Sequence, residues 1–453
     1  MGIKGLRNRL GEFWWASLIF FIALRFGDAI NAFTGLYVVP KFVSQDELGA
    51  LLPMLNFTTF LSLPLSIFIT GYTKLLNVCS VNNEWGKIKR MYIDVVRFSF
   101  VFVLLSILLV LIFHGLLFER LRVQNGRLCV VIVAAGLFGA FAPLFTNTLQ
   151  GLKKFRELSL VNIIAAPVRL IVILLAMPFR PLTGYFVAHG AVPFVQIVAS
   201  IFAIKKTVFS RSTASEPYFD KEKRIWFLRY IFLITLCVLP MVVGSCVETM
   251  IIRQRLSGLD SAAFYVLSRF AEIGGFLGLT LMVVLFPFAS EQQERGESSD
   301  LLLLKVICAS TLFSVAFAII CYFTKDYFLP LLPNGAAYLK YTKEFMLLIF
   351  IYSAIAIWSC FINNEIAAER FSFLRYHIVI QLLSVCGLFV LTGYGYFYGV
   401  LPTQWVDAIK ALDACRLDFL LWFMAGVNFL RIVCLAIHLF CRRANANHNI
   451  QPL

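Results

Sequence analysis

Charged side chains that stand inside long apolar stretches of this 453-residue chain indicate two kinds of chemistry. The bases are Arg25, Arg169, Arg269 and Arg431, and the acids are Asp28, Glu248, Glu272 and Glu365. An ionised group near a bilayer centre costs about 3 kcal/mol or more, so each should face a partner, a ligand or water. An arginine fork can hold two phosphate oxygens, whereas a buried carboxylate can exchange a proton or a cation. We predict that the four arginines bind substrate in a cationic cavity and that the four acids are ion-coupling candidates.

Two of these bases have an acid on the same helical face, which leaves two interpretations open. Arg25 and Asp28 are spaced i, i+3, and so are Arg269 and Glu272, so each pair can neutralise itself or contact the substrate. Arg169 has no acid within a helical turn, which makes it the best single candidate for an anion contact.

Glu248 also has two interpretations, because Arg253 follows it five residues later. It is either a proton- or cation-coupling site or one member of an ion pair. A further set of bases lies near the inner ends of the apolar runs, where long side chains are expected to reach the lipid headgroups. These are Lys74, Arg97, Arg229 and Lys305.

The pattern of cysteine and histidine residues indicates no metal site, no cofactor and no enzyme. The 11 cysteines form no CxxC, and the five histidines form no HExxH. We find no nucleophile–base pair and no paired carboxylates. A membrane glycosyltransferase or polysaccharide polymerase would carry catalytic motifs in large outer loops, whereas the longest outer loops here have about 20 residues.

The composition places these residues in a membrane. Hydrophobic residues make up 60% of the chain and charged residues 14%, with a net charge of +15. A soluble domain carries about 25% charged residues, so a soluble fold is excluded. A helix needs about 20 apolar residues to cross a bilayer. Such runs occur near 13–39, 47–76, 91–117, 128–150, 158–177, 185–204, 225–252, 262–289, 301–323, 343–366, 376–399 and 417–440. We predict an all-α polytopic membrane protein with about 12 transmembrane helices.

Basic residues in the short loops predict the orientation. With the N-terminus inside, the inside segments hold 20 Lys and Arg residues and the outside loops hold 12. The first apolar run is too long for a signal peptide, so we expect it to be retained. Both termini are therefore predicted to be cytoplasmic. The end of the helix bundle on the side of the termini is called the predicted cytoplasmic end below.

The polar connection at 205–224 lies near the midpoint of the chain and predicts two halves. We expect an N-terminal six-helix lobe at 1–204, a cytoplasmic linker at 205–224, a C-terminal six-helix lobe at 225–441 and a cytoplasmic tail at 442–453. The segment 404–416 is predicted to be an amphipathic helix on the outer membrane surface.

An internal repeat supports the division. A shift of about 213 residues aligns Gly49-Ala50 with Ala262-Ala263, and a shift of about 216 aligns Lys154-Phe155 with Arg370-Phe371. Because six helices are an even number, both halves enter from the same side. Such halves are related by an axis along the membrane normal, with the substrate site between them.

Three stretches resemble a known family. Residues 36–49 read LYVVPKFVSQDELG, like the first hairpin of bacterial polysaccharide flippases. Residues 149–155, LQGLKKF, are similar to the turn after that family's fourth helix. The stretch from Glu248 through Leu256-Ser257-Gly258 to Ser290 resembles its seventh and eighth helices. The resemblance is to the O-antigen and exopolysaccharide branch of the multidrug/oligosaccharidyl-lipid/polysaccharide exporter superfamily.

The resemblance implies a flippase that moves an undecaprenyl-diphosphate-linked oligosaccharide across a bacterial inner membrane, for cell-surface polysaccharide (lipopolysaccharide O-antigen) synthesis. It implies two six-helix lobes, alternating access and cavity arginines at Arg25 and Arg269. Partners would be the lipid-linked substrate, membrane lipids and a polysaccharide polymerase complex, with no nucleic acid.

Rival transporter classes share parts of this pattern. The lipid II flippase branch usually has fourteen spans, and the turn motif of major-facilitator transporters is absent from 73–87. The alternative that remains is a cation-coupled small-molecule antiporter of the multidrug type, which would favour an acidic cavity.

Overall fold

The computed structural model describes residues 3–120, 126–209, 218, 221–256, 258–333, 335–391 and 417–448. All regular structure within these residues is helical, and ten helical segments are long and apolar enough to cross a membrane. The 36-residue helix α4 and the shorter apolar helix α13 bring the set to the twelve that the sequence predicts. The chain is therefore an all-α, multi-pass membrane protein.

Six long helical segments build the first half of the chain. They are α1 (Ile3–Phe33), continued by the π-helical turn Thr34–Val38 and by α2 (Val39–Phe42), then α3 (Gln45–Val81), α4 (Trp85–Arg120), α5 (Gly126–Gly151), α6 (Phe155–Ala176) and α7 (Pro181–Ile204). Local sequence determines several of their starts. Ser44 and Glu47 form a reciprocal capping box at the start of α3, and Pro181 occupies the first position of α7, where no amide hydrogen is needed.

Six more segments build the second half. They are α8 (Lys221–Arg255), a composite of α9 (Gly258–Ala271), the 3-10 turn η3 (Glu272–Gly275) and α10 (Phe276–Glu294), then α11 (Asp300–Phe328), α12 (Thr342–Ala367), α13 (Leu374–Leu391) and α15 (Leu417–His448). The predicted surface helix at 404–416 and most of the predicted linker lie outside the described residues, as do the ends of the eleventh span and of the tail. The domain boundaries stay predictions.

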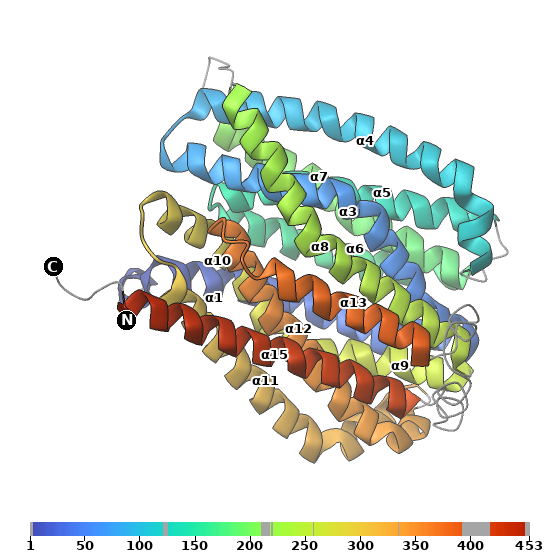
Figure 1. Ribbon diagram of the computed structural model, residues 1–453. Coiled ribbons are helices and arrows are strands. Elements are labelled where there is room, and N and C mark those ends of the chain that lie inside the picture. The colour runs from blue at the N-terminus through green and yellow to red at the C-terminus, as the bar shows by residue number, and fades with distance from the viewer. Residues whose placement is uncertain are drawn as a thin grey trace.

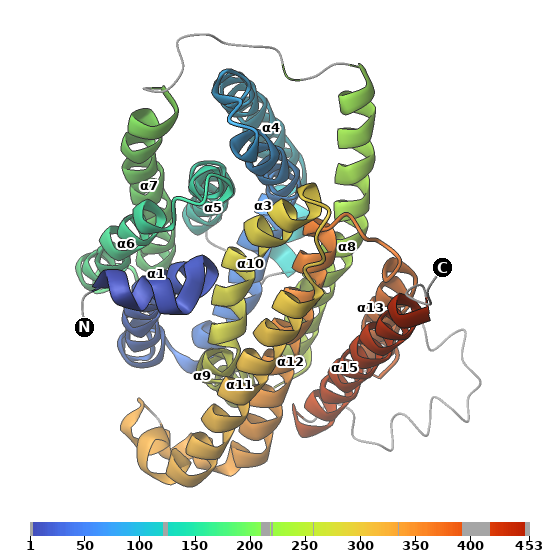
Figure 2. The ribbon, with the colours of Figure 1, turned by 90° about the vertical axis from the view of Figure 1, so that its left-hand side faces the viewer.

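The helices pack as two lobes. In the first lobe α5 packs against α3 and α7, and α6 packs against α1 and α7. In the second lobe α12 packs against α10, α11 and α15, and α13 packs against α8. The lobes meet where α3 packs against α8 and α9, and where α1 packs against α10 (Figure 2). Helix α1 begins and α15 ends at the same end of the bundle (Figure 1), which is the predicted cytoplasmic end.

Four helix-ending turns repeat at the two offsets found in the sequence. Asn83 and Gly296 have left-handed backbones (φ 59° and 70°) and are 213 residues apart. Lys153 and Glu369 also have positive φ angles (54° and 56°) and are 216 residues apart. In all four turns the next residue donates its amide hydrogen to a carbonyl five residues back, which is the Schellman arrangement. The two lobes thus end equivalent helices in the same way.

The lobes also touch at the opposite, outer end. Gly49 of α3 packs against Ser261 of α9, and a Cβ atom built on Gly49 would lie 2.5 Å from Ser261 Oγ and 2.9 Å from its Cβ. The 213-residue offset aligns Gly49 with Ala262, the neighbour of Ser261. Equivalent parts of the two halves therefore meet across the lobe interface.

This contact gives a prediction about stability. We expect Gly49→Ala to destabilise the protein by about 1–3 kcal/mol, because overpacking a tight contact costs that much. The double variant Gly49→Ala/Ser261→Gly removes the clashing atoms and should recover most of the loss. Thermal unfolding in detergent measures both. Gly139→Ala is the matched control, since no atom lies within 4 Å of a Cβ built there. Equal melting temperatures for Gly49→Ala and the native chain would contradict the packing.

Candidate functional site

A cavity of about 280 Å³ lies where the second lobe faces α3, inside the membrane-spanning part of the bundle. It is lined by residues of α3, α8, α9, η3, α12, α13 and α15. The polar lining residues are Asn56, Thr59, Ser245, Glu248, Thr249, Arg269, Glu272, Tyr352, Gln381, Asn428 and Arg431. Four of the eight charged residues predicted from the sequence therefore line one cavity.

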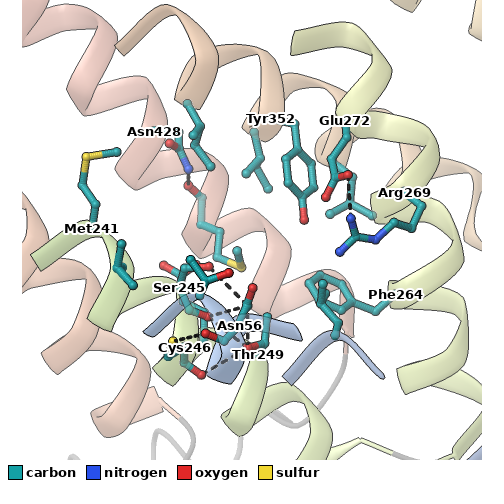
Figure 3. A pocket seen from close by; sticks show the side chains of 18 of the residues that line it. Asn56, Met241, Ser245, Cys246, Thr249, Phe264, Arg269, Glu272, Tyr352 and Asn428 are labelled. Atoms are coloured by element: carbon teal, nitrogen blue, oxygen red, sulfur yellow. Dashed lines mark hydrogen bonds and ion pairs between the residues drawn. The ribbon is translucent and has the colours of Figure 1, made fainter. Parts of the chain in front are cut away.

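One side of the cavity carries an ion pair set by a change of helix type. Arg269 lies in the last turn of α9, and Glu272 begins the 3-10 turn that joins α9 to α10. Arg269 Nη1 donates to Glu272 Oε2 at 2.9 Å. Figure 3 shows the pair beside Tyr352 of α12. The predicted i, i+3 pairing is present, and both members still line the cavity.

Glu248 of α8 has weaker partners than Glu272 has. Ser384 Oγ donates to Glu248 Oε1 at 3.1 Å, and Arg431 is the basic group close enough to act on Glu248 electrostatically. Within the described residues no base lies within 4.0 Å of this carboxylate. Arg431 instead donates to Asn428 Oδ1 at 2.6 Å. Glu248 is thus a half-buried carboxylate that, among the described residues, is held by one hydrogen bond from a hydroxyl group.

Uncharged polar residues complete the cavity and cross the lobe interface. Asn56 Nδ2 of α3 donates to Thr249 Oγ1 at 3.0 Å and to Ser245 Oγ at 3.3 Å, both on α8 (Figure 3). The sequence did not single out these residues. Ser and Thr in apolar helices usually bond their own backbone, so they give no separate signal. The i, i+4 spacing of Ser245 and Thr249 around Glu248 is the one usable clue.

A second polar cluster lies between α1 and α10. Arg25 Nη2 lies 2.8 Å from Asp28 Oδ2 and donates to Thr280 Oγ1 at 2.9 Å, and its guanidinium lies 4.2 Å from the centre of the Phe276 ring. Asp28 in turn is close enough to Glu272 to act on it electrostatically. Arg25 and Asp28 therefore form their predicted pair at the lobe interface, next to the cavity wall.

Arg169 of α6 has no ion pair within the described residues, as its sequence context predicts. Its guanidinium donates to Asn31 Oδ1 at 3.2 Å and to Tyr185 Oη at 2.9 Å. His189 lies within electrostatic reach of both Arg169 and Arg269. Arg169 therefore stands beside the lobe interface, outside the cavity lining.

Glu365 lies apart from the other predicted acids, at the predicted cytoplasmic end of α12. Its Oε1 atom is 3.1 Å from Arg370 Nη2 and 3.0 Å from Arg442 Nη1. The side chain is 1% exposed. The structure thus places Glu365 in an arginine cluster away from the cavity.

Lys74 is not at the headgroups, and this expectation was wrong. Its side chain is fully buried, and its Nζ atom lies 3.4 Å from Glu369, 3.8 Å from Glu294 and 2.8 Å from the carbonyl oxygen of Ala367. Lys74 belongs to the first lobe and all its partners to the second. Between the lobes the Lys74 ammonium group has three oxygen partners, and these take the place of the lipid headgroups.

A second ion pair closes the same end. Lys153, in the turn between α5 and α6, pairs with Glu291 of α10, and its Nζ lies 4.1 Å from the centre of the Phe288 ring. The first lobe thus supplies both lysines, and the second lobe supplies the acids. Because the contact between Gly49 and Ser261 closes the outer end, the lobes meet on both sides of the cavity.

The cavity has the properties of a binding site. Its four charged residues are two arginines and two glutamates, so their formal charges cancel. Among the described residues no group of three or more His, Cys, Asp or Glu side chains is placed to hold a metal ion together. The arrangement can bind a small polar or charged solute and can exchange a cation at Glu248.

No family model matches the chain, and no curated protein does. Solved structures match over almost the whole length. A crystal structure of MATE in the straight conformation has a TM-score of 0.69 at 11% identity, over 99% of this chain and 100% of that one. An inward-facing multidrug resistance MATE family transporter of the MOP superfamily gives 0.65 at 12%, over 94% and 96%. A MOP superfamily transporter from Pyrococcus furiosus, described as having a binding pocket of reverse polarity, gives 0.65 at 12%, over 97% and 98%. The chain therefore has the fold of the MATE and MOP superfamily transporters.

Proposed function

We propose that this protein is a cation-coupled antiporter of small molecules that works by alternating access. The observation that carries the proposal is the cavity itself, with its two glutamates and two arginines. The surplus of bases within the apolar runs favoured an anionic, lipid-linked substrate. Within the cavity that surplus is absent, because Glu248 and Glu272 balance Arg269 and Arg431.

The size of the cavity supports a small solute. Small-molecule pockets usually have volumes of about 300–1,000 Å³. The volume of about 280 Å³ is close to the lower limit. It is too small for an oligosaccharide on a diphosphate carrier in this conformation. The fold supports the same choice, since one similar structure is that of a multidrug resistance transporter.

Glu248 is the proposed coupling residue. When it is ionised, it can attract a proton or a metal cation, and its single hydroxyl hydrogen bond leaves room for either. When the cation binds, the balance of charge with Arg431 changes, so the affinity for a charged solute changes too. Solute and cation then favour different states of the same cavity, which is what exchange requires.

The two lobe contacts give alternating access a physical basis. Opening the predicted cytoplasmic end must break the ion pairs of Lys74 and Lys153. Opening the outer end must separate Gly49 from Ser261. Rocking of one lobe against the other can break one set while it keeps the other.

A second candidate function is the flipping of a lipid-linked oligosaccharide across a bacterial inner membrane. The observation in its favour is the interlobe group of Arg25, Arg169 and Arg269, which supplies phosphate-binding forks beside the cavity. The Pyrococcus furiosus transporter is described as having a binding pocket whose reverse polarity suggests a different function, which supports more than one function for this fold. A polysaccharide polymerase complex would be the partner of such a flippase.

Arg169→Gln separates the two functions, because Arg169 has no carboxylate partner and lies outside the cavity lining. Under the antiporter proposal, solute exchange should stay within about fivefold of the native rate, since the variant loses hydrogen bonds and a contact with the Tyr185 ring but no residue of the cavity lining. Under the flippase alternative, lipid-linked sugar should accumulate on the inner leaflet of cells that carry this variant alone. Solute exchange in proteoliposomes and leaflet-specific labelling of the lipid-linked sugar measure the two outcomes. The antiporter proposal is contradicted if cells with Arg169→Gln accumulate lipid-linked sugar and the native protein shows no solute exchange.

A further inference from the structure

An apolar groove runs along the outside of the second lobe, between α11, α12 and α15. It has a volume of about 460 Å³, and its lining includes Leu304, Phe350, Ile357, Leu435 and Leu439. Leu304 and Phe350 are 43% and 40% exposed, so the groove opens on the lipid-facing surface. In a membrane, such a surface contacts acyl chains.

A basic pocket lies at the predicted cytoplasmic end of α12, α13 and α15. It has a volume of about 510 Å³ and is lined by Arg370, Arg375, His438 and Arg442, together with Glu365. Arg370 and Arg442 both form ion pairs with the carboxylates of Asp300 and Glu365. Arg375 is exposed and forms no ion pair within the described residues.

The groove and the basic pocket share two helices, α12 and α15. On α15 the groove residues 432, 435, 436 and 439 follow a helical face that continues to Arg442, one turn later. On α11 the groove residue Leu304 lies one turn after Asp300, whose Oδ1 atom is 2.9 Å from Arg442 Nη2. On both helices the groove therefore runs toward the arginines and carboxylates at the predicted cytoplasmic end.

Charge selects the class of lipid. The pocket and its partner carry three arginines against the carboxylates of Glu365 and Asp300, so one positive charge remains. That charge is accessible on Arg375. Basic pockets between transmembrane helices on the cytoplasmic side suit anionic headgroups.

We propose that this composite site binds one anionic phospholipid of the inner leaflet, with an acyl chain in the groove and the phosphate at Arg375 and Arg442. The site is separate from the transport cavity and goes beyond the proposed function. A lipid bound at this site would also affect transport. Arg370 follows Glu369, which pairs with buried Lys74, so a lipid there would steady the turn that closes the predicted cytoplasmic end.

Native mass spectrometry of the full chain in detergent tests the site. Phosphatidylglycerol and phosphatidylcholine with identical acyl chains are titrated separately. We expect phosphatidylglycerol to bind about fivefold more tightly, the contribution of one basic side chain near an anionic headgroup. Arg375→Gln should abolish this preference and leave phosphatidylcholine binding unchanged. Arg97→Gln is the matched control, because Arg97 is an exposed base on another helix.

A second variant tests the groove. Ala436→Phe fills it and should weaken the binding of both lipids, whereas Ile437→Phe, on the same helix outside the lining, should not. Both positions are exposed, so neither change affects the core. Inorganic phosphate at matched ionic strength should not displace phosphatidylglycerol. Displacement by phosphate would identify a free-anion site instead. An unchanged preference in Arg375→Gln, or native lipid binding in Ala436→Phe, would overturn the proposal.

Discussion

Glu248→Gln is expected to lose cation-coupled transport while it keeps the fold. The amide has nearly the shape of the carboxylate and can still accept the hydrogen bond from Ser384 Oγ. It cannot take up a proton or attract a cation at neutral pH. We expect exchange driven by a cation gradient to fall by about a hundredfold or more, because a differential interaction of about 3 kcal/mol is lost. Fluorescent solute uptake by proteoliposomes under an imposed gradient measures the rate.

Asp326→Asn is the control for this variant. Asp326 is an exposed acid at the outer end of α11, with 65% of its side chain accessible, and among the described residues it pairs with the neighbouring Lys325 alone. Its amide variant should transport at the native rate. If Glu248→Gln keeps gradient-driven uptake at the level of Asp326→Asn, the coupling site is elsewhere.

Lys74→Met should weaken the closure at the predicted cytoplasmic end more than any other single change there. The substitution leaves Glu294, Glu369 and the carbonyl of Ala367 without the ammonium group that joins them. Removing one partner of a fully buried pair costs about 3–5 kcal/mol, and the loss here should be smaller because the side chains of Glu294 and Glu369 are 34% and 31% exposed. Thermal unfolding in detergent should show this loss, and a cysteine placed in the turn between α12 and α13 should be labelled faster.

A charge exchange separates the pair from general damage. Lys74→Glu should be worse than Lys74→Met, because it sets a third acid beside two others. Lys74→Glu/Glu369→Lys should recover part of the stability, since it restores one pair across the lobes. Lys305→Ala is the control, because Lys305 is exposed near the same end. Equal stability of both Lys74 single variants and Lys305→Ala would show that the lobes do not depend on this contact.

The sequence was sufficient for the fold because the bilayer leaves few choices. A run of about 20 apolar residues must satisfy its own backbone hydrogen bonds, so each predicted span is helical over the residues that the structure describes. The offsets of 213 and 216 residues also appear in the structure, as the four equivalent turns at Asn83, Gly296, Lys153 and Glu369. Turns of this kind depend on local backbone geometry, which a short alignment can detect.

The site was only partly predictable, and the limit was distance along the chain. The pairs of Arg25 with Asp28 and of Arg269 with Glu272 are local and follow from spacing. The burial of Lys74 depends on partners more than 200 residues away, which no local pattern shows. The hydrogen bond from Asn56 to Thr249 is equally distant in sequence, because α3 meets α8 only in the folded bundle.

The central claim is exchange of a small solute for a cation through the cavity, and one measurement tests it most directly. The native protein and Glu248→Gln are reconstituted in proteoliposomes, and a proton gradient or a sodium gradient is imposed while solute uptake and cation counterflow are recorded together. We predict that the native protein couples the two fluxes under one of the gradients and that Glu248→Gln shows neither. Native protein that moves no solute under either gradient, yet transfers a lipid-linked oligosaccharide between leaflets, would contradict the claim and establish the flippase instead.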